Sequence, residues 1–289
     1  MKRILVPLDG SELSEKVLAH IEILAKRADV ETTLLRAVPF FWPSEFKHVR
    51  EMGDKMDKEA SDYLFAINAQ LGEKGIKAEV CVDEGNVPEV ICDFAREKSV
   101  DLIAMSTHGR GGVKRWALGS VANKVIQAAP VPVLLYRSTG SKVTSSHYKN
   151  VLIPVDGSHF SENIFPQARY LVELFKAKVW FLYVINPYLM ESFTSLSIIK
   201  KDMKFIKDTQ YYFPTLEKRL KKAKANYELV IKKGDPSETI CKFAEKNEIN
   251  LIAMSTHGHG GITRWALGSV ADKVVRSSPK PVLLIRAKE

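Results

Sequence analysis

The segment IAMSTHGRGGVKRWALGSVANKVIQAAPVPVLLYR, at residues 103–137, occurs a second time as IAMSTHGHGGITRWALGSVADKVVRSSPKPVLLIR at residues 252–286. The two copies match without a gap at 25 of 35 positions. Such a long repeat within one chain indicates that a whole structural unit has been duplicated. We therefore expect the same fold to occur twice.

The duplication reaches back to the start of each copy. A chain of 289 residues is long enough for two domains, each with a core of its own. We expect domains at residues 1–138 and 149–289, joined by the polar linker STGSKVTSSHYK at residues 138–149. The shorter matching segments are ILVPLDGSELSE at 4–15 with VLIPVDGSHFSE at 151–162, and GNVPE at 85–89 with GDPSE at 234–238.

Strands and helices are expected to alternate within each repeat. Short apolar runs predict strands, and apolar residues spaced three or four apart predict helices. This alternation predicts right-handed crossovers and a parallel sheet covered on both faces, so the fold class is α/β with two tandem doubly wound sheets. In the first repeat we expect strands at 4–8, 32–38, 78–82, 102–105 and 131–136, and helices at 11–28, 45–74, 88–98 and 119–128.

Charge is unevenly distributed along the chain. Residues 1–140 contain 19 basic and 20 acidic side chains, whereas residues 141–289 contain 24 and 14. Much of the excess lies between Lys200 and Lys224, where apolar residues are interleaved with lysines. We interpret this stretch as a helix with a solvated lysine face; an acidic protein partner or a membrane surface is the alternative. Nucleic-acid binding is disfavoured because arginine-rich or aromatic readers are missing.

Composition indicates a folded globular protein, with 45% hydrophobic and 27% charged residues. No apolar run approaches the roughly 18 residues of a membrane span, and the first apolar stretch is too short for a signal sequence. The cysteines, Cys81, Cys92 and Cys241, are odd in number and lack metal-ligand spacing, so we expect reduced thiols in the core. These features favour a cytoplasmic protein.

Two loops, each following an expected strand, have the chemistry of an anion site. The first is PLDGS at residues 7–11, repeated as PVDGS at 154–158, and the second runs from 106 to 120 with its copy at 255–269. Glycines allow backbone N–H groups to approach phosphate oxygens, and a Gly-Ser helix start offers unpaired donors. A tight turn is the alternative for any single loop. Because both copies retain both loops, a ligand is favoured.

Other nucleotide and catalytic motifs are missing from the sequence. There is no G-x-x-x-x-G-K-[ST] segment, and no G-x-G-x-x-G follows the first strand, so a P-loop enzyme and a dinucleotide oxidoreductase are both unsupported. His108 and His257 have no partner histidines or cysteines nearby in sequence, so we expect no metal site. A loop-shaping or phosphate-donating role is expected for His108.

The loops resemble those of the universal stress protein family, and the resemblance covers nearly all of both repeats. The family's motif is G-x2-G-x9-G-[ST], before a helix and a final strand that contains proline. One departure occurs in both copies, because serine occupies the position of the first glycine. The matching residues are Ser106, Gly109, Gly119 and Ser120 in the first copy, and Ser255, Gly258, Gly268 and Ser269 in the second.

The resemblance implies strand order 3-2-1-4-5 and an adenine nucleotide, ATP or AMP, with Mg²⁺ bound through the phosphates. It also implies an internal pseudo-dimer through the two final strands, and leaves a homodimer open. Asp9 and the end of the second strand would lie against adenosine. The implied nucleotide-binding residues are Pro7, Leu8, Asp9, Ala37, Met105, Ser106, His108, Gly109, Arg110, Gly112, Gly119, Ser120 and Val121, with Pro154, Val155, Asp156, Val184, Met254, Ser255, His257, Gly258, His259, Gly261, Gly268, Ser269 and Val270.

Three functions fit these features. The favoured one is a regulatory or sensor module that binds an adenine nucleotide in the stress response. Slow ATP hydrolysis or self-phosphorylation is the second, and an interaction protein without a ligand is the third. An efficient ATPase needs a group that orients water and charges that clamp the γ-phosphate. Asp9 is the only recurrent carboxylate near the loops, so no catalytic residue is assigned.

The two sites differ in charge. Arg110, Lys114 and Asn123 of the first copy are replaced by His259, Thr263 and Asp272 in the second. We therefore expect the first site to bind a triphosphate severalfold more tightly, because fewer positive charges face the phosphates in the second site.

Overall fold

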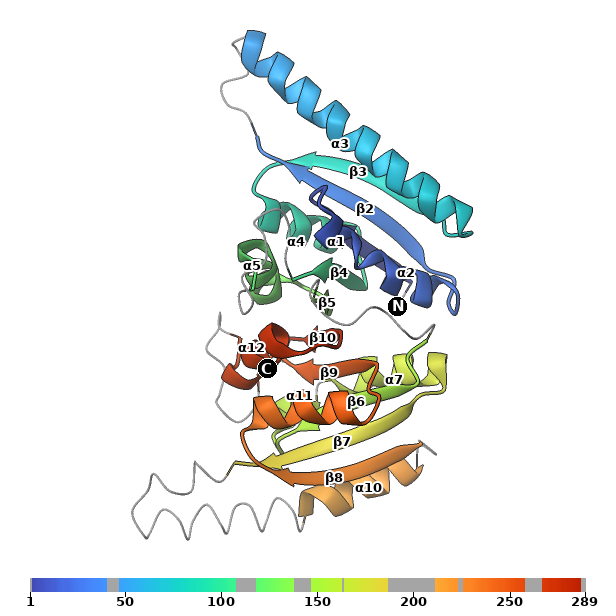
Figure 1. Cartoon of the computed structure of the whole chain (residues 1–289), viewed down its shortest axis with the longest axis vertical. Helices are drawn as coiled ribbons and strands as arrows, with labels where there is room; N and C mark the ends of the chain where they lie inside the picture. Colours follow the sequence, from blue (N-terminus) through green and yellow to red (C-terminus); the bar gives the residue numbers. More distant parts are fainter. Residues whose placement is uncertain are drawn as a thin grey trace, which may run out of the picture.

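One continuous ten-stranded sheet runs through the whole protein, in the order β3-β2-β1-β4-β5-β10-β9-β6-β7-β8 (Figure 1). The computed structural model describes residues 2–40, 47–107, 118–137, 147–162, 164–186, 211–222, 226–257 and 267–286. The strands of the first repeat are β1 (Arg3–Pro7), β2 (Glu31–Val38), β3 (Ala78–Glu84), β4 (Leu102–Ser106) and β5 (Val133–Tyr136). Those of the second are β6 (Asn150–Val155), β7 (Lys178–Ile185), β8 (Tyr227–Lys233), β9 (Leu251–Ser255) and β10 (Val282–Ile285).

Each repeat has the strand order 3-2-1-4-5, with parallel pairing inside the repeat, as expected. The α/β class and the doubly wound topology are therefore confirmed. The described helices are α1 (Glu12–Glu15), α2 (Leu18–Ala25), α3 (Lys47–Glu73), α4 (Val87–Glu97), α5 (Ser120–Ala128), α6 (His159–Glu162), α7 (Phe165–Phe175), α10 (Phe213–Lys222), α11 (Pro236–Lys246) and α12 (Ser269–Ser277).

Two apolar cores cover the two faces of the sheet, and both extend across the boundary between the repeats. The first core contains buried residues of α2, α3, α7 and α10. The second contains buried residues of α4, α5, α11 and α12. Because each core draws on both repeats, the repeats share one packed interior.

The final strands, β5 and β10, join the repeats by antiparallel pairing. Val133 lies opposite Leu284, and Leu135 lies opposite Val282. Val133 and Val282 hold equivalent positions in the two repeats, so the register follows a pseudo-twofold axis through the central pair, Leu134 and Leu283. Pairing covers two apolar strand edges that separate repeats would expose. The expected pseudo-dimer contact is confirmed.

The expected uninterrupted helix at residues 11–28 is wrong, because the structure divides it into α1 and α2. Ser11 does cap the start, since its Oγ accepts a hydrogen bond from the Ser14 N–H at 3.2 Å. The Val17 N–H then bonds to Ser14 O at 3.4 Å, and the His20 N–H bonds to Val17 O at 2.9 Å. These tighter i to i+3 bonds interrupt the α-helix and bring Val17 into the core.

The expected polar linker at residues 138–149 is also partly wrong, because Tyr148 is a core residue with only 2% of its surface exposed. Its hydroxyl lies 2.9 Å from Nδ1 of His20 on α2. Its ring makes an edge contact with Phe175 on α7, with 5.1 Å between centroids. One aromatic side chain thus connects the two repeats. Residues 138–146 lie outside the described ranges.

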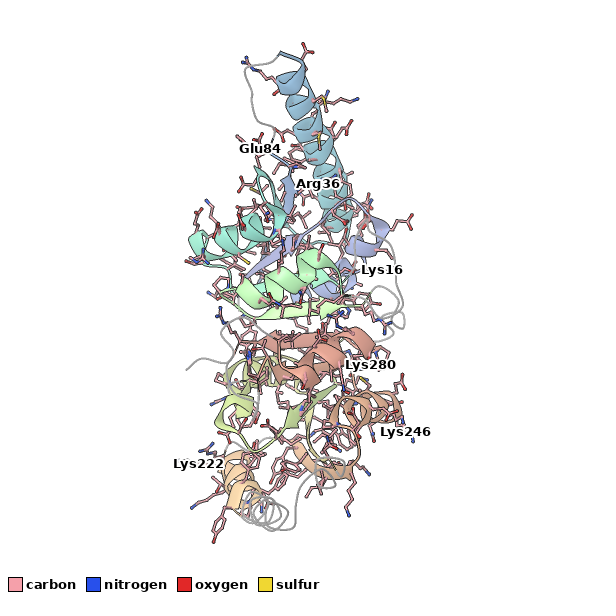
Figure 2. All side chains as sticks on the ribbon, turned by 90° about the vertical axis from the view of Figure 1, so that its left-hand side faces the viewer. Lys16, Arg36, Glu84, Lys222, Lys246 and Lys280 are labelled. Carbon is pink, nitrogen blue, oxygen red and sulfur yellow. The ribbon has the colours of Figure 1, made fainter. Side chains whose placement is uncertain are left out.

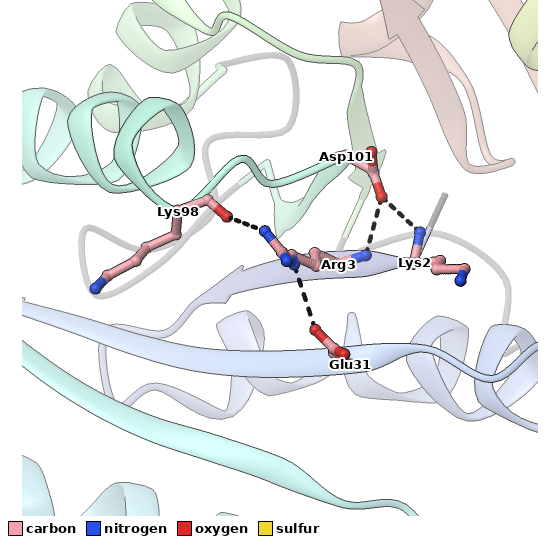
Figure 3. Close-up of polar contacts among 5 residues, drawn as sticks. All are labelled: Lys2, Arg3, Glu31, Lys98 and Asp101. Atoms are coloured by element: carbon pink, nitrogen blue, oxygen red, sulfur yellow. Dashed lines mark hydrogen bonds and ion pairs between the residues drawn. The ribbon is translucent and has the colours of Figure 1, made fainter.

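A polar network fastens the amino ends of β1 and β4 (Figure 3). The Asp101 carboxylate accepts hydrogen bonds from the N–H groups of Lys2 and Arg3, at 2.6 and 3.1 Å. The Arg3 guanidinium donates to the Lys98 carbonyl at 2.9 Å and lies 3.3 Å from Glu31. These contacts align two neighbouring strands at their amino ends. The carboxyl ends of the same two strands lie at the other end of the strands.

The basic stretch from Lys200 to Lys224 is described only from residue 211 to 222. There, Leu216 is buried and Tyr212, Phe213 and Leu220 pack against the core. Lys218, Arg219, Lys221 and Lys222 are exposed. The described part therefore has the expected solvated basic face.

The expected core thiols are confirmed for Cys92, which is buried, whereas Cys81 and Cys241 are partly exposed; all three are free. Burial raises the pKa of Cys241 to about 11, so this thiol stays protonated near neutral pH. Among the described helices, none has the combination of length and apolarity that crossing a membrane requires.

Candidate functional site

The carboxyl ends of β1 and β4 lie side by side in the first repeat. Ile4 pairs with Leu102 and Leu5 with Ile103, in parallel register. On its other side, β1 pairs with β2, so that Pro7 lies opposite Leu35. This arrangement brings the Asp9 loop, the end of β2 and the end of β4 to one edge of the sheet. The second repeat has the same pairing between β6 and β9.

The Asp9 loop is fixed by its own side chains. Asp9 Oδ1 accepts hydrogen bonds from the Ser11 N–H at 3.0 Å and from the Ser11 hydroxyl at 2.6 Å. Gly10 between them has φ +82°, which favours glycine. Asp156 and Ser158 repeat both contacts at 3.0 and 2.6 Å. The aspartate carboxylate is therefore held in a defined orientation in both repeats.

The helices that follow β4 and β9 begin directly on the strand ends. The N–H of Gly119 donates to Thr107 O at 2.9 Å, and that of Gly268 donates to Thr256 O at 2.8 Å. A Cβ atom at residue 268 would lie 2.8 Å from the same Thr256 oxygen. Only glycine fits this close approach, so the residue closes the loop as well as opening the helix.

The first turns of α5 and α12 have the character of an anion site. Gly119 and Gly268 are the N-cap residues, and neither has a side chain to accept a hydrogen bond from the turn. Ser120 and Ser269 follow, and both are exposed. A helix start without a side-chain cap directs unpaired N–H groups and the positive end of the helix dipole outward.

Serine fits at the position of the motif's first glycine. Ser106 and Ser255 are the last residues of β4 and β9, with 6% and 7% of their surface exposed. The described residues other than glycine with positive φ are Ser99, Lys176 and Glu248. Both serines therefore have ordinary strand backbone, and replacing glycine strains nothing there.

His257 is positioned at the start of the second glycine-rich loop. Its Nδ1 lies 2.9 Å from the Thr256 hydroxyl, and its N–H donates to Ser255 Oγ at 3.5 Å. Its Nε2 is buried and has no hydrogen-bond partner in the part of the chain that the structure describes. Burying a ring nitrogen without a hydrogen bond destabilises the folded protein. A hydrogen bond from this nitrogen to a ligand oxygen would remove that cost.

Most expected site residues lie at these strand and helix ends. Met105 and Met254 are buried in the second core, while Ala37, Val184, Val121 and Val270 pack against it. Pro7 ends β1 and Leu8 follows it, while Pro154 and Val155 are the last two residues of β6, so all four lead directly into the Asp9 and Asp156 loops. The expected residues that lie outside the described ranges are His108, Gly109, Arg110, Gly112, Gly258, His259 and Gly261.

Two residues important to this geometry were missed in the sequence. Thr107 and Thr256 are buried, with 3% and 4% exposure, and their carbonyls receive the glycine N–H groups. Thr256 also orients His257. The repeated Ser-Thr-His segment pointed to these threonines. Their role was still missed, because the sequence does not show which backbone carbonyls accept hydrogen bonds.

Contacts behind the Asp9 loop differ between the repeats. In the first, Tyr63 donates to Glu15 at 3.0 Å and lies beneath the Arg36 guanidinium. Burial, reinforced by the hydrogen bond to Glu15, raises the pKa of Tyr63. In the second, Tyr183 takes the place of Arg36, and Glu162 pairs with Arg219 at 2.9 Å.

These features define a doubly wound α/β protein of two tandem repeats, each with a glycine-started helix where the winding of the sheet reverses. A sequence profile described as the Universal stress protein family matches residues 1–137 and 147–286. The chain belongs to the universal stress protein family.

Known relatives agree with this placement. A universal stress protein of Methanocaldococcus jannaschii is 32% identical over 139 residues, covering 47% of this chain and 82% of that protein. One of Mycolicibacterium smegmatis is 24% identical over 301 residues, covering 99% of this chain and 97% of the relative. The crystal structure of a universal stress protein from Archaeoglobus fulgidus has the same fold, with TM-score 0.77, 23% identity and 98% of each chain covered.

Proposed function

We propose that each repeat, at residues 1–138 and 149–289, binds an adenine nucleotide, ATP or AMP, at the carboxyl ends of its first and fourth strands. The observation that carries this proposal is the helix start at Gly119 and Gly268, which has no side-chain cap. The N–H of each glycine donates to a threonine carbonyl directly after the fourth strand of its repeat, close to the Asp9 or Asp156 loop. Sites of this class lie where the winding of a doubly wound sheet reverses.

The phosphates would bind at the first turns of α5 and α12, where N–H groups and the exposed hydroxyls of Ser120 and Ser269 are available. In the second repeat the buried Nε2 of His257 is a further polar group for a phosphate oxygen. The described residues include no group of three or more side chains suited to hold a metal ion. In this proposal Mg²⁺ binds through the phosphates of the nucleotide.

The adenosine would lie toward β1 and β2, against Asp9 and Ala37 in the first repeat and Asp156 and Val184 in the second. Two hydrogen bonds from Ser11 orient the Asp9 carboxylate, which suits it to receive ribose hydroxyls. We infer a regulatory or sensor role in the stress response. A cytoplasmic location is part of the proposal, since the three free cysteines suit a reducing compartment.

The test uses aspartate at the exposed helix starts. Asp is favourable at a helix N-terminus but repels phosphate, so the Ser120→Asp/Ser269→Asp double variant should fold and lose nucleotide binding. Thermal shifts with ATP, AMP and GTP would be compared in the wild type, the double variant and a Ser120→Ala/Ser269→Ala control. We expect adenine nucleotides to stabilise the wild type and the control only. Equal stabilisation of the aspartate variant would disprove the assignment of the site.

A further inference from the structure

The two outer strands of the sheet, β3 and β8, differ in their capacity to pair with themselves. Each ends the strand order on its side, and no strand among the described residues pairs with its outer backbone edge. In Figure 1 they lie at opposite ends of the long axis, beside α3 and α10. Figure 2 places Glu84 of β3 near one end and Lys222 of α10 near the other.

Strand β3 is unsuited to antiparallel pairing with a second β3. A twofold axis through Cys81 would place Glu79 of one chain opposite Asp83 of the other, twice. Like charges directly opposite each other destabilise an antiparallel pair. Glu84 at the end of the strand adds further negative charge. Like charges therefore disfavour this pairing of β3 with another copy of itself.

Strand β8 has the opposite property. A twofold axis through Val230 places Glu228 of one chain opposite Lys232 of the other, and Leu229 opposite Ile231, each twice. Leu229 packs against the first core and Val230 against the second, so alternate residues face opposite sides of the sheet. The charged pairs would therefore share one face and the aliphatic pairs the other. Ile231 is 49% exposed and is one of the exposed large hydrophobic side chains among the described residues.

We propose that β8 is a homodimer interface, at which it pairs antiparallel with β8 of a second copy of the chain. A twofold contact of this kind is closed and self-complementary. It would repeat, between chains, the antiparallel edge pairing that β5 and β10 make within the chain.

Charged neighbours of β8 fit this pairing. Glu228 already forms an ion pair with Lys178 of β7, so Lys232 of the second copy would join an existing charge pair. Lysines on an outer strand normally discourage edge pairing. In the proposed register Lys232 lies opposite Glu228 of the second copy. In other registers Lys232 would lack this partner, so the lysine would favour the proposed register over the others.

The test is sedimentation of the full chain over a concentration series at low and high salt. We expect a monomer–dimer equilibrium that weakens with salt. Lys232→Glu places one carboxylate opposite each Glu228, at both charged pairs of the dimer, and should raise the dimer dissociation constant about tenfold. Adding Glu228→Lys restores opposite charges across the axis and should return it to within about threefold of the wild type. Lys222→Glu, on α10, is the matched control and should have little effect.

The outcomes are distinct. Rescue by the charge swap supports the β8 contact, because that pairing alone predicts recovery from two substitutions in one chain. A monomer at all concentrations overturns the proposal. A dimer that ignores Lys232→Glu, or is not restored by the swap, also overturns it, as does open-ended growth. Thermal melts would confirm that each variant is folded. Nucleotide binding is measured separately and is independent of this result.

Discussion

The starts of α5 and α12 have nearly the same backbone but different charges. Gly119 has φ −57° and ψ 147°, and Gly268 has φ −59° and ψ 145°. One turn later, however, Asn123 in the first repeat corresponds to Asp272 in the second, where Arg276 binds both carboxylate oxygens at 2.9 and 2.8 Å. The fold thus fixes the geometry of the site, while its charge has diverged. Any difference in ligand affinity between the repeats should come from side chains.

A second difference lies in the core. His20 of α2 is 2% exposed in the first repeat, whereas the equivalent position of the second repeat is Gln167. His20 pairs with Tyr148, so the first repeat depends on a buried titratable group at its contact with the second. The junction strands, by contrast, are related by pseudo-twofold symmetry.

The symmetric junction predicts that equivalent substitutions in β5 and β10 lower the free energy of unfolding by equal amounts. Leu135 of β5 and Leu284 of β10 hold equivalent positions, and each is 1% exposed. Lysine at either would bury an unpaired charge, so Leu135→Lys and Leu284→Lys should each reduce the free energy of unfolding by roughly 3–5 kcal/mol. Urea unfolding and small-angle scattering would measure stability and separation of the repeats. Unequal effects, or an unchanged radius and stability, would refute the symmetric junction.

The buried histidine predicts acid sensitivity of the first repeat. Burial lowers the pKa of His20 from 6.5 to about 4. Between these values the unfolded chain binds a proton that the native state excludes, so stability falls as pH decreases from about 6.5 to about 4. Above pH 6.5 both states are neutral at this position. The full loss is roughly 3 kcal/mol at or below pH 4.

The comparison of variants isolates this effect from other acid titrations. His20→Gln introduces the residue of the second repeat and should flatten the loss of stability between pH 7.5 and about 4.5, relative to the wild type. His147→Gln, next to Tyr148 and half-buried, is the matched control. If His20→Gln and the wild type lose stability in parallel, His20 is not titrating as its burial requires.

The charge difference at the helix starts predicts a smaller effect. Because Arg276 binds Asp272, much of that negative charge is already compensated. Asp272→Asn should therefore improve ATP affinity of the second site only about two- to threefold, whereas Arg276→Gln should weaken it. Both effects should diminish with salt. Calorimetry of each variant would decide: unchanged ATP affinity in both variants would show that the pair lies too far from the ligand, and a higher affinity with Arg276→Gln would contradict the prediction.

Local chemistry made much of the fold predictable. The repeat and the Ser11 cap depend on residues close together in sequence or on whole-segment similarity, whereas the strand order was implied by the family resemblance. The gap-free match of the helix starts likewise placed Gly119 and Gly268 correctly. Periodicity alone could not reveal the break at Val17, because the apolar spacing continues through it.

The remaining features depend on contacts between distant segments. Tyr148 follows the polar run STGSKVTSSH, so composition indicated a linker, whereas its burial comes from His20 and Phe175, far away in sequence. Gly268 was expected to make room for phosphate. In the structure, a side chain at residue 268 would first clash with the protein's own Thr256 carbonyl. This contact between two backbone segments cannot be read from the sequence. A valine there would therefore disturb folding as well as binding, which is why aspartate at Ser120 and Ser269 is the cleaner probe.

Isothermal calorimetry of the full chain with ATP and Mg²⁺ tests nucleotide binding most directly. We predict two bound ATP molecules for each wild-type chain, one after Ser120→Asp, one after Ser269→Asp, and none when both are changed. Each single variant should keep the wild-type melting temperature without ligand, because aspartate suits a helix start. Absence of ATP binding by the wild type, or full binding by the double variant, would contradict the proposed site.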